Sequence, residues 1–470
     1  MNETFIKTSS YTLDQIAITP VTSASQNACK LCSPLGAALV FKGIANSVPL
    51  LHGSQGCSTY IRRYVISHFK EPVDIACSNF GEQTAIFGGG VNFKVALDNI
   101  RKQYDPDFIG IATTCLAETI GDDVSMFLKE YKKQNHRDIL PHMVTVSTPS
   151  YQGTHIEGFN AAVKAVVQDL TKESGKGSCD PFINVFPGML SSADLRYLRE
   201  IIEDFNLNTM MLPDYSETLD GGLWRNYQRI PPGGTPAKQI KIAGSALASI
   251  EFGQCLALNK VTAGTVLTDR FNLFCNRIGL PIGITQTDRF LQVLSDLCGQ
   301  PIPKKYTQQR GRLLDALVDG HKIVNGKRAA VFGDPDLVAG LVEFLTEIGI
   351  QPIVCGTGVA KSGLLKALGS ILTEVQMKSI RVLENVDFIE MESVIKEVKP
   401  DLLIGTSKGY AMSRRLNIPL LRVGFPIHDR VGGHRQLQVG YLGAQTLFDR
   451  IANTFLSLQQ AASQVGFTYL

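Results

Sequence analysis

Three cysteines in the first quarter of the chain are the residues best suited to chemistry. Cys32 lies in Cys-Ser-Pro-Leu-Gly-Ala, Cys57 in His-Gly-Ser-Gln-Gly-Cys, and Cys115 in Thr-Thr-Cys-Leu-Ala-Glu. Each sits where an apolar run gives way to small or turn-forming residues, so we expect each thiol at a strand end or helix start. Free backbone N–H groups and the helix dipole favour a thiolate there. Three such thiolates would make half of a cage for an iron–sulfur cluster, and another chain would supply the other half.

Most of the remaining cysteines are expected to pack as buried apolar residues. The chain has 10 cysteines, and in a reducing compartment these are not expected to form a disulfide framework. Cys29 is the open case, because Cys29-Lys-Leu-Cys32 is a C-x-x-C sequence that can ligate a metal or do redox chemistry, although one such pair alone is a weak signal. The others are interpreted as small buried hydrophobes: Cys77, Cys179, Cys255, Cys275, Cys298 and Cys355.

Histidines and one threonine are weaker candidates. His52 precedes a glycine-rich turn and could bind a metal or carry a proton, but no second histidine lies at metal-ligand spacing. A hydrogen bond to the turn is therefore the favoured interpretation for His52, and the same holds for His155, His428 and His434. Thr154, in Gly-Thr-His, carries a hydroxyl that could approach a cluster or serve only the turn.

Composition excludes several classes of function. The 470 residues carry a formal net charge of +3, and no basic cluster interleaved with aromatics indicates nucleic-acid binding. We find neither a membrane-spanning apolar run nor a signal-peptide pattern at Met1 to Phe5, so we expect a cytoplasmic protein. No G-x-x-x-x-G-K-[ST] motif occurs, and the turn at Gly333 lacks G-x-G-x-x-G, so any ATP hydrolysis belongs to a partner.

Strand and helix patterns alternate along the chain and predict the fold class: α/β, with three Rossmann-like, doubly wound parallel-sheet domains and a C-terminal helix packing back on the body. Residues up to about 28 are interpreted as a polar arm. The domain boundaries are predicted at 1–178, 179–300 and 301–470. Within the middle domain, helices are predicted over 237–257, 268–278 and 285–298.

The motifs around the three cysteines, together with Phe87-Gly-Gly-Gly and the segment from Ser147 to Gly158, resemble the component 1 proteins of nitrogenase. The C-terminal Arg422-Val-Gly-Phe-Pro-Ile-His-Asp-Arg-Val-Gly resembles the β side of that family. The resemblance covers nearly the whole chain. It implies an α-type partner subunit (NifD/NifE-like) in an α2β2 heterotetramer, reduced by a homodimeric, ATP-hydrolysing iron protein.

The resemblance also implies roles for individual residues. Cys32, Cys57 and Cys115 match ligands of the interfacial P-cluster (8Fe-7S), and Thr154 falls where the β subunit has a serine that can bind the oxidised cluster. Phe87 matches the position at which the iron protein docks. No catalytic residue is expected on this chain, because the family's active-site cofactor belongs to the α-type subunit.

Two interpretations remain open. Retention of all three cysteines favours the β-type subunit of a nitrogenase-like reductase. Among such enzymes, our first hypothesis is methylthio-alkane reductase, which cleaves C–S bonds of small thioethers. The alternative is the NifN-type subunit of the cofactor maturation scaffold, which holds a four-iron cluster (4Fe-4S) and typically keeps only the cysteine matching Cys57. The C-terminal motif and Arg310-Gly-Arg-Leu-Leu-Asp-Ala favour this alternative.

Overall fold

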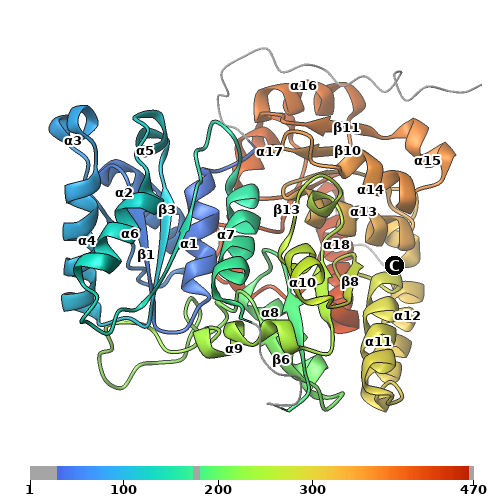
Figure 1. The fold of residues 1–470 in the computed structure, drawn as a ribbon. Helices are drawn as coiled ribbons and strands as arrows, with labels where there is room; N and C mark the ends of the chain where they lie inside the picture. Colours follow the sequence, from blue (N-terminus) through green and yellow to red (C-terminus); the bar gives the residue numbers. More distant parts are fainter. Residues whose placement is uncertain (1–28, 173–179, 465–470) are drawn as a thin grey trace, which may run out of the picture.

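Three parallel β-sheets form the framework of the computed structural model, which describes residues 29–172 and 180–464. The predicted N-terminal arm and Cys179 lie outside the described residues. Figure 1 shows the three sheets with their helices in sequence order, from the blue first part to the orange third part. Every strand pairing is parallel, as expected when helical crossovers connect successive strands.

The first sheet has the strand order β2-β1-β3-β4. Its strands β1 and β3 are buried along their whole length, as in a sheet covered on both faces. The elements of this part are α1 (Ser33–Lys42), β1 (Ser47–His52), α2 (Gln55–Phe69), β2 (Ala76–Cys77), α3 (Glu82–Phe87), α4 (Gly90–Tyr104), β3 (Phe108–Thr113), α5 (Cys115–Thr119), α6 (Val124–Gln134), β4 (His142–Val146) and α7 (His155–Leu170).

The second sheet has the order β6-β5-β7-β8. Its elements are β5 (Phe182–Phe186), α8 (Ser192–Glu203), β6 (Asn208–Met211), α9 (Ala237–Lys241), η2 (Ala243–Ser245), β7 (Ser249–Phe252), η3 (Leu256–Leu258), α10 (Ala263–Phe271), β8 (Cys275–Ile278) and α11 (Thr285–Cys298).

The third sheet has five strands in the order β11-β10-β9-β12-β13. Its elements are α12 (Lys304–Val324), β9 (Arg328–Phe332), α13 (Pro335–Glu347), β10 (Gln351–Thr357), α14 (Leu364–Ile371), α15 (Glu374–Ser379), β11 (Arg381–Glu384), α16 (Phe388–Val398), β12 (Leu402–Gly405), η4 (Ser407–Gly409), α17 (Tyr410–Leu416), β13 (Leu420–Arg422), η5 (Gly433–Arg435) and α18 (Gly440–Ala462).

The predicted fold class is confirmed, including the C-terminal helix. Helix α18 buries one apolar face that includes Leu447, Phe448 and Ile451. Phe448 lies so close to Gly320 of α12 that a Cβ on that glycine would be 2.4 Å from the ring. One continuous hydrophobic core extends from α1 through all three parts to α18. The boundaries at 178 and 300 stay predictions.

Two predicted helices are wrong. Within 237–257 the helix ends at Lys241, and Ser249–Phe252 forms strand β7 instead. Within 268–278 the helix ends at Phe271, because Asn272 adopts a left-handed conformation and Cys275–Ile278 then pairs with β7. Both strands are four residues long, and runs of that length do not distinguish a strand from a buried helical turn.

No helix in the ranges 29–172 and 180–464 is long and apolar enough to cross a membrane.

Candidate functional site

The three predicted cysteines lie at starts of helices in the first part of the fold. Cys32 is the N-cap of α1, Cys57 lies in the first turn of α2, and Cys115 is the first residue of α5. Helices α2 and α5 follow the carboxyl ends of β1 and β3, which are neighbours in the sheet. Carboxyl ends of parallel strands meet at one sheet edge, which is where α/β folds bind ligands.

Ser150 connects two of these thiols. Its backbone N–H donates to Cys115 Sγ at 3.2 Å, and its hydroxyl accepts from the Ser33 N–H at 3.1 Å while also hydrogen-bonding the Cys32 thiol. The Ser54 hydroxyl lies 3.5 Å from Cys57 Sγ. Each sulfur therefore has a hydrogen-bond donor from its own chain, and such donors stabilise a thiolate.

Cys32 lies within electrostatic range of both Cys57 and Cys115. Burial raises the pKa of Cys32, the Ser150 hydrogen bond lowers it, and negative charge on Cys115 or Cys57 raises it further. All three thiols are only half-buried. Three thiolates gathered in this way repel one another, so they need positive charge between them, which iron of a cluster would supply.

Thr154 lies beside Cys32. The two residues pair as an isolated antiparallel bridge, and the His155 N–H donates to Leu31 O at 3.0 Å. Thr154 is the N-cap of α7, and its N–H donates to the Glu157 carboxylate at 2.8 Å. Its hydroxyl faces the first turn of α7 as in a capping box, yet Oγ1 is buried and lacks a partner of normal hydrogen-bond geometry among the described residues. Beyond this capping contact the hydroxyl makes no well-formed hydrogen bond within the described chain, and its second lone pair can bind a group from outside it.

Cys29 lies apart from the other three. Its thiol is buried in a hydrophobic cluster with Phe332 and Met391 of the third part, and burial raises its pKa to about 12. Lys408, from η4, donates to Lys30 O at 3.1 Å and its charge interacts with both Cys29 and Cys32. Cys29 therefore packs as an apolar residue, while Lys408 brings a cation near Cys32.

His52 hydrogen-bonds a carboxylate rather than the backbone of its own turn. Its Nε2 lies 3.0 Å from Asp122 Oδ2, and that carboxylate accepts from the Gly89 N–H. His155 accepts from the Leu31 N–H through Nδ1 at 3.2 Å, and buried His434 contacts Asp220 at 3.0 Å. The predicted hydrogen bond of His52 to its own turn is therefore wrong, because the partner is Asp122. His155 and His434 contact other loops, and each of the three histidines joins segments that are distant in sequence.

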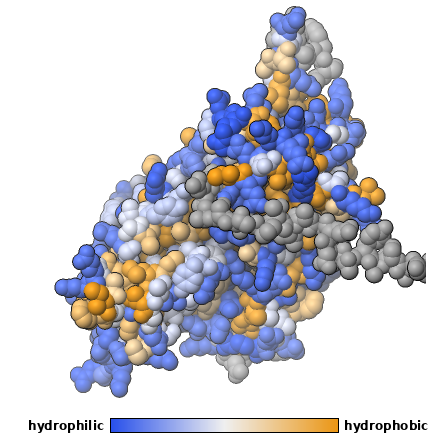
Figure 2. Space-filling model, turned by 90° about the horizontal axis from the view of Figure 1, so that it is seen from above, coloured by the Kyte–Doolittle hydropathy of each residue, from blue (hydrophilic) through white to orange (hydrophobic). Residues whose placement is uncertain are grey.

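Large apolar side chains are exposed in the part of the fold that carries the thiols. Phe87 at the end of α3 is 84% exposed, and Ile86 and Val91 are each 75% exposed. Tyr60 and Tyr151, close in sequence to Cys57 and Ser150, are also exposed. Figure 2 shows apolar atoms gathered at the edge of the molecule where α3 lies. Large exposed apolar groups around half-buried thiols are typical of a subunit interface.

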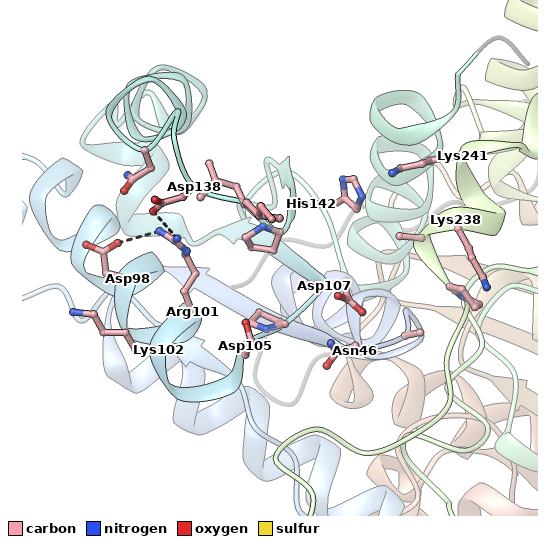
Figure 3. Close-up of a pocket in the computed structure, with 18 residues that line it drawn as sticks. Asn46, Asp98, Arg101, Lys102, Asp105, Asp107, Asp138, His142, Lys238 and Lys241 are labelled. Carbon is pink, nitrogen blue, oxygen red and sulfur yellow. Dashed lines mark hydrogen bonds and ion pairs between the residues drawn. The ribbon is translucent and has the colours of Figure 1, made fainter.

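A cavity of about 1070 Å³ lies elsewhere. It is lined by Asn46, Asp107 and His142, which stand at the amino ends of β1, β3 and β4, opposite the thiols (Figure 3). Arg101 on its wall is already paired with Asp138 at 2.8 Å. The cavity is open and is lined by charges of both signs, whereas cofactor sites are enclosed and mostly apolar. It therefore lacks the geometry of a cofactor site.

Within the described chain, no three His, Cys, Asp or Glu side chains gather closely enough to hold a single metal ion. The thiols are therefore not a mononuclear site. Sequence reasoning missed Ser150, Ser54, Asp122 and Lys408. Ser150 lies in the segment from Ser147 to Gly158, whose motif stands out in the sequence, but its contacts depend on the approach of α1 to the loop after β4.

Comparisons with known proteins agree with this architecture. The family model described as nitrogenase component 1 type oxidoreductase matches residues 32–456. The chain is 34% identical over 430 residues to the nitrogenase molybdenum-iron protein beta chain of Clostridium pasteurianum, covering 92% of this chain and 93% of that one. It is 33% identical over 448 residues to the nitrogenase iron-molybdenum cofactor biosynthesis protein NifN of Nostoc sp., covering 95% and 96%.

A solved structure titled "Nitrogenase Cp1 at pH 6.5" superposes with a TM-score of 0.91 at 33% identity, covering 98% of this chain and 100% of the other. The family match spans far more than half of the sequence, and the relatives align over nearly their full lengths. The chain therefore belongs to the nitrogenase component 1 type oxidoreductase family, as a β-type subunit of an oxidoreductase complex.

Proposed function

We propose that this chain is the β-type subunit of a nitrogenase-like reductase and holds half of an interfacial P-cluster (8Fe-7S) through Cys32, Cys57 and Cys115. The observation that carries the proposal is the set of three half-buried thiols at the starts of α1, α2 and α5, in the part of the fold that also exposes large apolar side chains. An α-type subunit would cover the thiols together with the exposed Tyr60 and Tyr151, leave Phe87 exposed, and complete the cage in an α2β2 assembly. When bound, such a cluster accepts and donates single electrons.

The chain's own residues prepare this site. Ser150 and Ser54 donate to the sulfurs, and Lys408 places a cation near Cys32. The Thr154 hydroxyl, buried without a partner of normal geometry in the described residues, offers a hard oxygen ligand that suits oxidised iron. These groups hold the thiols in place and balance their charge, while substrate reduction belongs to the partner subunit.

We further propose that Phe87 and the neighbouring Ile86 and Val91 receive a homodimeric, ATP-hydrolysing iron protein. Their exposure supports a docking role, and the chain has no ATP-binding motif of its own. The proposed reaction is reductive C–S cleavage of a methylthio-alkane, in which two electrons and two protons convert the thioether to a thiol and a hydrocarbon.

The second candidate is the NifN-type subunit of a maturation scaffold with a 4Fe-4S cluster. It is favoured by the similarity to NifN, at 33% identity over 95% of this chain, against 34% over 92% for the β chain. The two functions differ in what Cys32 and Cys115 do: both bind iron in the reductase, whereas Cys57 alone does so in the scaffold.

The test is iron content and electron paramagnetic resonance of the chain purified anaerobically with its α-type partner. For the reductase we expect an eight-iron cluster, lost or degraded in Cys57→Ala and in Cys115→Ala, together with reductase activity. Cys298→Ser, which removes a half-buried thiol at the end of α11, is the matched control and should leave iron unchanged. A four-iron cluster sensitive only to Cys57→Ala would establish the scaffold, and a complex without iron would reject both functions.

A further inference from the structure

The carboxylate of Asp122 joins two loops that are distant in sequence. Asp122 Oδ2 lies 3.0 Å from His52 Nε2, and the Gly89 N–H donates to Oδ1 at 3.1 Å and to Oδ2 at 3.0 Å. Because a carboxylate only accepts hydrogen bonds, His52 must carry its proton on Nε2. One side chain therefore holds both the end of β1 and the turn between α3 and α4.

This junction is sealed from solvent. The side chain of His52 is 0% exposed and that of Asp122 is 5% exposed. Phe80 and Phe93 pack edge-on against the imidazole, with ring centroids 4.8 and 5.2 Å away. Water cannot replace a lost hydrogen bond in such a site, so movement of one partner forces the others to follow or to lose their contacts.

The thiol-bearing loops are attached to the same junction. The carbonyl of His52 accepts from both the N–H and the hydroxyl of Thr114, each at 3.1 Å, and Thr114 immediately precedes Cys115. The Asp122 N–H donates to Ala117 O in α5 at 3.1 Å. From His52 the chain continues through Gly53 into the first turn of α2 and Cys57.

Asp122 also holds the turn that follows Phe87. Gly88 has φ +88°, a conformation that L side chains rarely adopt. A Cβ on Gly89 would lie 2.5 Å from Asp122 Oδ2 and 2.5 Å from Phe80 Cζ. The turn between the exposed Phe87 and the buried carboxylate is therefore closely packed around Gly89.

We propose that Asp122 is a positioning residue that couples binding at the Phe87 surface to the loops carrying Cys57 and Cys115. The inference rests on the proposed function, which places the iron protein on that surface. Binding there shifts the Gly89 N–H, the carboxylate moves with it, and His52 and Thr114 carry the shift to the two thiols. The coupling alters how the thiols are placed, without any contact between the iron protein and the cluster loops.

Hydrogen exchange measured by mass spectrometry tests the link. In Asp122→Asn we expect faster exchange in three segments together: 53–58, 81–92 and 114–119. The matched control is Asp123→Asn, since Asp123 accepts from Met126 N at 2.8 Å as the N-cap of α6 and asparagine also caps helices well. Faster exchange confined to one segment, or exchange equal to that of Asp123→Asn, would overturn the proposal.

A second measurement uses the wild-type complex with its α-type partner. Adding the iron protein should slow exchange at 81–92 by direct cover and should also change it at 53–58 and 114–119. It should shift the cluster midpoint potential, and Asp122→Asn should lose that shift while still binding the iron protein. An unchanged shift in Asp122→Asn, or exchange changes limited to 81–92, refutes the coupling. Absence of a cluster or of iron-protein binding would refute the proposed function instead. In that case the comparison of hydrogen exchange in Asp122→Asn and Asp123→Asn still tests whether Asp122 connects the three segments.

Discussion

Replacing Gly158 by alanine should displace the thiol of Cys32, because two helices cross at this residue. A Cβ on Gly158 would lie 2.0 Å from Ser33 O, and one on Gly36 would lie 1.7 Å from His155 O. The opposing atoms are backbone, so no side-chain rotation relieves the clash. Helices α1 and α7 must separate by about 1.4 Å to restore ordinary van der Waals contact at Gly158.

The expected magnitude follows from two opposing terms. Overpacking a rigid site costs about 1–3 kcal/mol, and a backbone clash places Gly158→Ala near the top of that range. Alanine's greater helix propensity returns about 1 kcal/mol. We therefore expect a net loss of about 2 kcal/mol in the free energy of unfolding. Since Ser33 follows Cys32, the separation also reaches the paired backbones of Cys32 and Thr154, and bound iron should fall.

Urea unfolding followed by far-ultraviolet circular dichroism, with iron content of the anaerobic complex, measures both effects. Gly311→Ala is the control: Gly311 is an exposed glycine in α12, and a Cβ added there would meet no atom within 4 Å. This control should gain about 0.5–1 kcal/mol. Wild-type stability and iron content in Gly158→Ala would show that α1 and α7 move apart freely, and the reasoning would be wrong.

Two further predictions concern buried polar groups. Burial lowers the pKa of His68 and of His155 to about 3, so the folded protein binds protons at these sites less tightly than the unfolded chain does. Stability is then fully present above about pH 6.5 and falls as the pH drops toward 3, by up to about 1.4 kcal/mol per pH unit for each histidine. Urea midpoints at pH 8 and pH 5 measure this loss, which should persist in the exposed-site variant His136→Gln; a flat profile would contradict it. Thr154→Val removes a hydroxyl without a partner of normal geometry in the described chain, so the melting temperature should stay within a few degrees while the paramagnetic resonance spectrum of the oxidised cluster changes; identical spectra would exclude Thr154 as a ligand.

The positions of the three thiols could be predicted because local residues determine them. Glycine, proline and serine around Cys32, Cys57 and Cys115 mark the change from strand to helix, and that signal is short-range. Buried strands such as Phe182–Phe186 and Leu402–Gly405 are continuous apolar runs, and that signal is equally local.

The partners of those thiols could not be predicted, because they come from distant parts of the chain. Lys408 lies 378 residues from Lys30, whose carbonyl it contacts, and Asp122 lies 70 residues from His52. The periodic spacing of apolar residues in the sequence does not indicate which loops meet at a sheet edge. The short strand Ser249–Phe252 was missed for a related reason, since its pairing with β5 and β8 rather than its own sequence makes it a strand.

Residues 29–32 are held by hydrogen bonds to the third part of the fold, and this has a consequence for biosynthesis. The Cys29 N–H donates to Val386 O at 3.4 Å, Lys30 Nζ donates to Asn385 Oδ1 at 3.0 Å, and Lys408 donates to Lys30 O. During translation, Cys32 leaves the ribosome long before residues 385–408 exist. The segment that carries this thiol thus acquires its final anchors only when the third sheet is made, so the proposed insertion of iron at Cys32 would have to wait for nearly the whole polypeptide.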